Sequence, residues 1–364
     1  MIELQNIDTR NLPEAIALSL NELAVHYADF GENHDGRNGH LFSARNKVSN
    51  AEVAIKYYYG EPGDARHDEP RVLQEINSPN VINIYEARNV DDEWAFFITP
   101  WRQDGNLDRL ISERCKLRRA ITLTTNIALG LSELHQRNLV HRDLKPANIV
   151  LNNDVPEIAD FGSVKLLPNA VGQTTASQHT LLYKPPEAFI DGTYTKQGDY
   201  YQLGCILYQL CGGKFPYDIM EHFNTKDAKA YRALDDDFHR SQFVDRVIER
   251  KCIKSKILDI SSLPPYIPNA VRKCIRELTA ISLDRRPSTI GSVNGCLSRA
   301  LNSINGDWWH DQNGIIYRQK DNSRIVFSPV ENNLYRVDQN KGNGFRRVPK
   351  TADEPLNQLL KRFI

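Results

Sequence analysis

The sequence lacks a long apolar run and an excess of charge of either sign. Its longest predominantly apolar stretch without a charge, from Tyr200 to Gly213, is shorter than the roughly 18–20 residues that cross a bilayer. The N-terminus contains Glu3 and no apolar core segment, so we expect no secretory signal. Lys and Arg number 46, and Asp and Glu also number 46, which gives a formal net charge of zero. We therefore expect no membrane span and no general binding to nucleic acid.

The six cysteines include no C-x-x-C pair. This absence argues against a zinc ribbon or a disulfide scaffold, and it predicts reduced, mostly buried thiols in a cytoplasmic protein. The 364 residues, 40% hydrophobic and 25% charged, are typical of a globular protein with two or three folding units.

The apolar pattern divides most of the chain into a β-rich part followed by a helical part. Residues 13–25 repeat apolar positions at helical spacing and predict a short helix. The runs HLFSAR, EVAIKYYY, VINIYEA and EWAFFI predict strands, with a helical interruption at 69–76. Beyond Gly105 we expect helices, among them 118–136, a helix at 200–213 that is buried on every side, and one in 269–288 that stops at Pro287.

From Asp307 onward the sequence predicts a second, small β-rich unit. Its four expected strands lie in WWHDQNGIIYRQ, RIVFSPV, NLYRVDQ and GFRRVP, and PLNQLLKRFI predicts a helix with one apolar side. A unit of about 60 residues buries too little core to be stable alone. We therefore expect it to pack against the rest of the chain; a partner protein or a second copy of the chain is the alternative cover. Its aromatic residues are interpreted as core rather than as a binding face: Trp308, Trp309, Tyr317 and Tyr335.

The eight residues HRDLKPAN, from His141 to Asn148, carry the strongest chemical signal. Transfer of a γ-phosphoryl group to a hydroxyl needs an acceptor for the hydroxyl proton, positive charge at the phosphoryl oxygens, and a metal held in line. Asp143 suits the first task and Lys145 the second. Asn148 suits the third, because its carbonyl oxygen is a hard ligand for Mg²⁺. Further along, DFG supplies Asp160, whose carboxylate would hold Mg²⁺ between the β- and γ-phosphates.

At this spacing the two motifs resemble the catalytic domain of eukaryotic-type (Hanks-type) serine/threonine protein kinases, over roughly residues 27–302. The resemblance implies an α+β, bilobal protein kinase fold at 27–303, with a β-rich N-lobe (27–100) and a helical C-lobe (101–303). Residues 1–26 would be an N-terminal helical extension, and residues 304–364 a small β-rich C-terminal module. The resemblance also implies that ATP with Mg²⁺ phosphorylates Ser or Thr hydroxyls of protein substrates, including the chain itself. The lysine two residues after the catalytic Asp is the Ser/Thr-type arrangement.

The resemblance extends to the nucleotide side. Val53-Ala54-Ile55-Lys56 matches the strand whose lysine pairs with the α- and β-phosphates, and Glu69 is its expected helix partner, although Pro70 follows it. Of the three glycines usual in the phosphate loop, two are present, and His34 replaces the first. The remaining residues implied around the nucleotide are Gly36, Gly39, Leu41, Ala54, the gatekeeper Thr99, Pro100, Arg102, Asn106 and Val150.

On the substrate side, the resemblance implies that Glu187 pairs with Arg286 and that Asp199 braces the catalytic loop. Arg142, beside the catalytic Asp, implies control by a phosphate on the activation segment between Asp160 and Glu187. Thr175 and Ser177 are the candidate sites. A segment ordered without phosphate is the alternative.

Two other functional classes are weighed against an active kinase. A pseudokinase that senses nucleotide or acts as a scaffold is favoured by His34 and Pro70, and it is disfavoured because Lys56, Asp143, Asn148 and Asp160 are all present. A small-molecule phosphotransferase of similar fold is disfavoured by the segment 180–187, which in protein kinases cradles a protein substrate.

Overall fold

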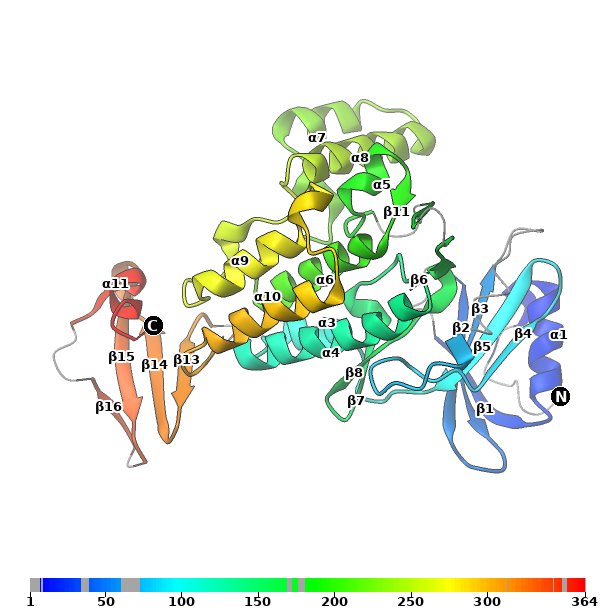
Figure 1. Cartoon of the computed structure of the whole chain (residues 1–364), viewed down its shortest axis with the longest axis horizontal. Helices are drawn as coiled ribbons and strands as arrows, with labels where there is room; N and C mark the ends of the chain where they lie inside the picture. The colour runs from blue at the N-terminus through cyan, green and yellow to red at the C-terminus, as the bar shows by residue number, and fades with distance from the viewer. Residues whose placement is uncertain are drawn as a thin grey trace.

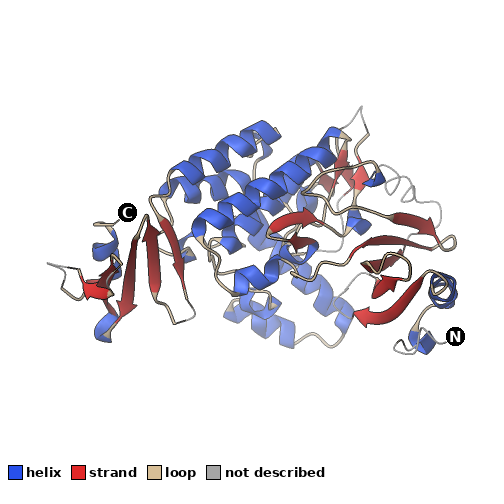
Figure 2. Cartoon of the chain, turned by 90° about the horizontal axis from the view of Figure 1, so that it is seen from below, coloured by secondary structure: helices blue, strands red, loops and turns tan. Residues whose placement is uncertain are grey.

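The computed structural model describes residues 7, 9–33, 39–59, 73–168, 172–175, 181–311, 313–342, 344–348 and 352–363. A sheet lobe and a small second sheet lie at opposite ends of a helical lobe, with the two termini at opposite ends of the molecule (Figure 1). Figure 2 shows the same arrangement from below, with the helices gathered between the strands of the two ends. The expected α+β, bilobal kinase fold with a β-rich C-terminal appendage is confirmed. The described residues contain no helix long and apolar enough to cross a membrane.

The N-lobe is a five-stranded antiparallel sheet, and helix α1 (Glu14–Leu23) covers one of its faces. Phe42 and Ile55 of this sheet are fully buried with Leu20 of α1. Side chains alternate between the two faces of a strand, so Leu41 and Lys56, which are paired neighbours of these residues, face the other way, toward the C-lobe. The strand order is β1 (Tyr27–Asn33), β2 (His40–Asn46), β3 (Glu52–Tyr59), β5 (Trp94–Pro100), β4 (Glu86–Asn89).

The expectation that a strand covers 81–87 is only partly correct, because β4 begins at Glu86. The residues before it are committed to the C-lobe: Val81 forms an isolated bridge with Ile158, and the Ile82 amide donates to the Ile158 carbonyl at 2.9 Å. The segment therefore ties the two lobes together instead of extending the sheet.

The C-lobe is built around two helices. The expected helix at 118–136 is present as α4 (Leu117–Gln136). The helix expected at 200–213 is present as α6 (Lys196–Leu210), and all of its residues from Gly198 onward are buried. The other helices are α3 (Leu107–Ser112), α5 (Pro186–Ile190), α7 (Thr225–Arg232), α8 (Asp237–Ile253), α9 (Asn269–Leu278) and α10 (Ile290–Asn302). Three two-stranded pairs complete the lobe: β6 (Leu139–Val140) with β9 (Lys165–Leu166), β7 (Ile149–Asn152) with β8 (Val155–Ile158), and β10 (Thr174–Thr175) with β11 (Thr193–Tyr194).

Along the described chain, short 3₁₀ turns lie at Thr9–Asn11, Pro146–Asn148, Phe161–Ser163, Ile219–His222, Ile260–Ser262, Leu283–Arg285 and Glu331–Asn333.

The expectation of one helix that stops at Pro287 is wrong, because α9 already ends at Leu278. The carbonyl of Ala280 instead accepts two hydrogen bonds from the guanidinium of Arg286, at 2.8 and 3.1 Å. The chain then turns through a 3₁₀ segment into α10, which the sequence reasoning did not foresee.

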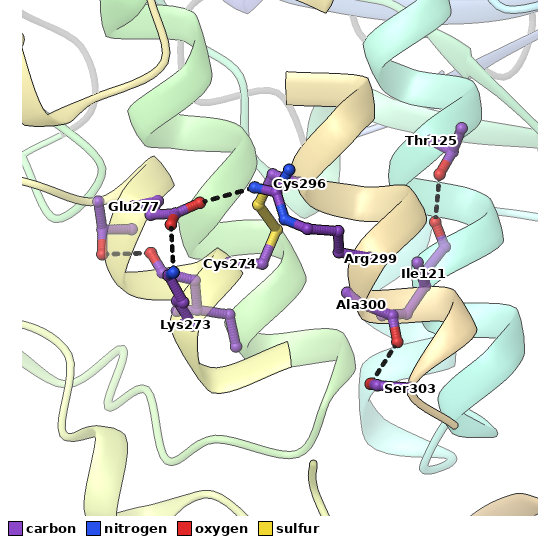
Figure 3. Close-up of a disulfide and its surroundings, with 11 residues drawn as sticks. Ile121, Thr125, Lys273, Cys274, Glu277, Cys296, Arg299, Ala300 and Ser303 are labelled. Carbon is purple, nitrogen blue, oxygen red and sulfur yellow. Dashed lines mark hydrogen bonds and ion pairs between the residues drawn. A yellow bond between two sulfur atoms is a disulfide. The ribbon is translucent and has the colours of Figure 1, made fainter. Parts of the chain in front are cut away.

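The expectation that all the cysteines are reduced is also wrong. Cys274 on α9 and Cys296 on α10 form a disulfide, with their Cα atoms 5.5 Å apart (Figure 3). The two positions are 22 residues apart, and only the packing of α9 on α10 brings them together. The other four cysteines are free, and three of them are buried.

The C-terminal appendage is a six-stranded antiparallel sheet with one short helix, α11 (Leu356–Leu360). The run expected as a first single strand is in fact two strands, because β12 ends at His310 and β13 begins at Ile316. The sheet order is β12 (Asp307–His310), β13 (Ile316–Lys320), β14 (Ser323–Pro329), β15 (Leu334–Asn340), β16 (Phe345–Arg347), with β17 (Glu354–Pro355) paired to β15.

The expected packing of the appendage against the C-lobe is confirmed. Trp308 of β12 is 2% exposed and stacks on Tyr266 of the C-lobe, with ring centroids 5.6 Å apart. The Tyr266 hydroxyl also bonds His310 Nδ1 at 2.7 Å. The apolar side of α11 faces the sheet of the appendage, where Leu359 and Leu360 are buried. Contacts within the chain thus bury the apolar side of α11, for which a partner protein or a second copy of the chain was the alternative cover.

Candidate active site

Asp143 lies in the loop between β6 and β7 and is only 2% exposed. Its Oδ2 accepts hydrogen bonds from Lys145 Nζ at 2.8 Å and Asn148 Nδ2 at 3.1 Å. Its Oδ1 is buried and has no hydrogen-bond partner among the residues described. A buried acceptor without a partner costs about 1–3 kcal/mol and is typical of a site that awaits a ligand. The arrangement leaves one carboxylate oxygen available for a hydroxyl proton, beside a fixed positive charge.

Asp160 begins the 3₁₀ turn after β8 and faces Lys56 across the lobes. Lys56 Nζ lies 2.5 Å from Asp160 Oδ2. Burial by itself would raise the pKa of the Asp160 carboxyl, but the positive charges of Lys56 and Lys145 outweigh it and lower the pKa below its usual value. The group is therefore ionised at neutral pH. Its φ of 61° is in the left-handed region, an uncommon backbone for aspartate that functional sites often retain.

Asn148 supplies the second ligand type that magnesium favours. Its amide nitrogen donates to the Asp143 carbonyl at 2.7 Å as well as to the Asp143 side chain, which leaves the carbonyl oxygen for a metal. Among the described residues, no cluster of three or more His, Cys, Asp or Glu side chains could hold a metal. The amide of Asn148 and the carboxylate of Asp160 fit Mg²⁺, provided that phosphate oxygens and waters complete its octahedron.

Asp199, at the start of α6, fixes the backbone of the catalytic loop. It is fully buried, and its Oδ2 accepts from the His141 amide at 3.0 Å and from His135 Nε2 at 2.8 Å. Its Oδ1 accepts from the Arg142 amide at 3.0 Å and from the Tyr194 hydroxyl at 2.9 Å. Burial would raise the pKa of this carboxyl, but the hydrogen bonds that it accepts, above all the one from His135, lower the pKa overall. The expectation that Asp199 braces the loop is confirmed.

Gln202 is a functional residue that the sequence reasoning missed. It accepts from the Leu144 amide at 2.8 Å and donates to the Arg142 carbonyl at 3.2 Å. The signal was present, because Gln202 follows Asp199 by three residues on a helix and so shares its face. Together the two side chains hold the loop on both sides of Asp143.

His141 connects the catalytic loop to the metal side. Its Nε2 donates to the Ala159 carbonyl at 3.0 Å, one residue before Asp160, and its Nδ1 accepts from the Asp143 amide at 3.3 Å. The imidazole therefore couples the positions of the two carboxylates.

The residues expected around the adenine lie on the faces that the resemblance implies. Leu41 is paired with Lys56, and Ala54 with Thr99, on the face of the sheet opposite α1. Val150 lies on β7 of the C-lobe and is partly buried. Pro100 is the last residue of β5 and is buried.

Two of the expected nucleotide contacts have other partners in the structure. The Arg102 guanidinium forms a bidentate ion pair with Glu157 of β8, at 2.7 and 2.8 Å. This pair was not predicted from the sequence. The Asn106 side chain accepts from the Asp108 amide at 3.1 Å and caps α3. Adenine contact by the Arg102 amide and ribose contact by Asn106 stay predictions.

The phosphate loop is described only at Gly39. A Cβ there would lie 2.1 Å from the Tyr57 carbonyl oxygen, so glycine is required by close contact with β3, apart from any phosphate. Gly36, and Glu69 as the partner of Lys56, lie outside the described residues.

On the substrate side, the Glu187–Arg286 pair is confirmed. The guanidinium contacts both carboxylate oxygens, at 2.7 and 3.0 Å, and both residues are buried. Arg142 Nε donates to the Ser163 carbonyl at 2.6 Å, which ties the catalytic loop to the activation segment. Ser177 and the side chain of Thr175 lie outside the described residues, so their phosphorylation stays a prediction.

These features define a class of phosphoryl-transfer protein: a lysine of one lobe that meets a carboxylate of the other, a buried carboxylate paired with a second lysine, and a carboxylate and an amide suited to Mg²⁺. The family comparison agrees, because the family model described as "Protein kinase domain" matches residues 31–294. The chain belongs to the protein kinase family.

Curated relatives are similar over parts of the chain. Serine/threonine-protein kinase ATG1a of Arabidopsis thaliana is 31% identical over 50% of this chain and 30% of its own length. "Serine/threonine-protein kinases drp72" of Corynebacterium efficiens is 26% identical over 72% of this chain and 48% of its own. The human 3-phosphoinositide-dependent protein kinase 1 is 33% identical over 40% of this chain and 27% of its own. The matches thus span from about a quarter to about half the length of these relatives.

Proposed function

We propose that the protein is an active serine/threonine protein kinase that transfers the γ-phosphate of MgATP to protein hydroxyls. The observation that carries the proposal is the buried Asp143 Oδ1 without a partner, next to a carboxylate oxygen held by Lys145 and Asn148. A general base must offer a free acceptor to the hydroxyl, and Lys145 lies where it would neutralise charge on the transferred phosphoryl group.

Preference for Ser and Thr is supported by Lys145 and by the printed names of the relatives. ATP would be held by Lys56 and the face of the N-lobe sheet opposite α1, and Mg²⁺ by Asn148 and Asp160. The cytoplasmic location stays a prediction, and it loses one of its supports because Cys274 is oxidised in a disulfide.

The pseudokinase alternative predicts nucleotide binding without transfer. The test compares the parent protein with two variants, Asp143→Asn and Asp92→Asn. Asp92 is an exposed carboxylate of the N-lobe, so its variant serves as the matched control. Transfer from labelled ATP to a generic protein substrate is followed beside the affinity for MgATP. We expect Asp143→Asn to lose about 10²–10⁴-fold in rate and to keep its nucleotide affinity, with Asp92→Asn unchanged.

Two results would contradict the proposal. Parent protein that binds MgATP and phosphorylates neither itself nor any protein would favour the pseudokinase. Full activity in Asp143→Asn would remove the role given to this carboxylate.

A further inference from the structure

A cavity of about 800 Å³ opens on the C-lobe, and no residue of the catalytic loop lines it. It lies between the end of α5, the chain that follows α8, and α9, and we call it the α9 cavity. Its lining includes several aliphatic side chains. Three of these are Ile190, which is 56% exposed at the end of α5, with Ile257 and Leu258 after α8. The volume lies within the range of about 300–1,000 Å³ that is usual for ligand pockets, and the aliphatic lining suits an apolar group.

The charges that line the α9 cavity are unbalanced, although the whole chain is neutral. Three cations line it, Lys273, Arg276 and Arg285, and Glu277 is the one anion. Glu277 already pairs with Lys273 at 3.7 Å and with Arg299 at 3.4 Å (Figure 3). Arg276 and Arg285 are exposed, and neither forms an ion pair within the described part of the chain. The cavity therefore offers an apolar lining beside two unneutralised guanidinium groups.

We propose that the α9 cavity binds an acidic segment of a protein, with one apolar side chain inserted and neighbouring carboxylates on Arg276 and Arg285. The two cations are exposed, and they lie on separate elements, α9 and the 3₁₀ turn Leu283–Arg285. This distribution suits several carboxylates along a polypeptide. The buried cation next to the cavity, Arg286, is not available to a small anion, because it is already paired with Glu187.

The location identifies the partner as a protein substrate, and this step depends on the proposed function. Ile190 is the last residue of α5, and Glu187 lies in the first turn of the same helix. Arg285 directly precedes Arg286, whose guanidinium bonds Glu187. The cavity is thus built on the same elements that hold the end of the activation segment. An acidic segment bound there would be presented on the substrate lobe and would be separate in sequence from the phosphorylated residue.

The binding step is tested without catalysis. The probe is a fluorescein-labelled peptide of Glu and Asp with Leu and Phe at its centre, and its anisotropy is followed as protein is added. The variant Arg276→Glu with Arg285→Glu is compared with Lys226→Glu with Lys229→Glu, which makes the same charge change on exposed α7 residues outside the cavity. We expect binding to the parent and to the α7 variant, and affinity about tenfold weaker for the cavity variant. Unchanged thermal unfolding by circular dichroism shows that the cavity variant is folded.

Three results overturn the binding proposal: no binding to the parent, equal loss in both variants, or equal affinity after Leu and Phe are replaced by Ser. The substrate step is tested by joining the acidic segment through a Gly-Ser linker to a phosphoacceptor peptide. We expect a lower KM for the joined peptide with the parent, no such gain with the cavity variant, and equal kcat for the unjoined peptide. A KM that the segment does not change overturns substrate recruitment. Anisotropy binding without phosphorylation of either peptide overturns the proposed function and leaves the binding proposal standing.

Discussion

Replacement of Asp199 by Asn removes a single charge from the buried support of the catalytic loop and preserves its shape. The carboxylate accepts four hydrogen bonds, two at each oxygen. An amide retains one oxygen, and its NH₂ must face one of the two donor pairs. The less costly orientation turns it toward Arg142 N–H and the Tyr194 hydroxyl, because the hydroxyl can rotate and accept. One buried N–H, that of Arg142, then loses its acceptor.

The expected magnitude follows from these contacts. A buried donor left without a partner costs about 1–3 kcal/mol. The bonds that remain to His141 and His135 change from charge-assisted to neutral, which costs about 1 kcal/mol each. We therefore expect Asp199→Asn to lower the free energy of unfolding by about 3–5 kcal/mol. We also expect it to reduce kcat, because Arg142 directly precedes Asp143.

The assay is urea unfolding followed by circular dichroism, with Asp92→Asn as an exposed control. Folding lowers the pKa of Asp199, so its stabilising effect is fully present above the unfolded pKa of about 3.9. The effect is lost as the pH falls through the lower folded value, and the gap between parent and variant should narrow there. A difference below about 1 kcal/mol at pH 7 would refute the reasoning.

Three further outcomes are expected. Arg286→Met should lower the free energy of unfolding by about 3–5 kcal/mol, because it leaves Glu187 as an unpaired buried charge, and joint replacement of both residues by Met should recover part of the loss in the same urea assay. Trp308→Ala should expose the junction Asn305-Gly306 to limited proteolysis, since loss of a buried Trp costs about 3–5 kcal/mol; cleavage of the parent at an equal rate would show that the appendage is independent. Asp160→Asn should remove most of the Mg²⁺ dependence of ATP binding by calorimetry, and an unchanged dependence would count against this metal ligand.

The predictions that the sequence supported best depend on residues close together in the chain. The loop His141–Asn148 is contiguous, and its backbone turn places Asp143, Lys145 and Asn148 in mutual hydrogen-bonding distance. The buried helix α6 was evident from an apolar composition that no surface helix shows. The α8 helix was not foreseen, because it is mostly polar and buries only Val247, Ile248 and Cys252.

Pairings between residues that are distant in the sequence were decided only by the tertiary structure. The Cys274–Cys296 disulfide, the Arg102–Glu157 ion pair and the unbalanced charge of the α9 cavity all join segments whose separation in sequence carries no signal. Sequence alone fixes local backbone preference and the pattern of burial, because these depend on neighbours along the chain. Which distant side chains meet depends on how helices and sheets pack, since a contact energy arises only once the intervening chain has been ordered.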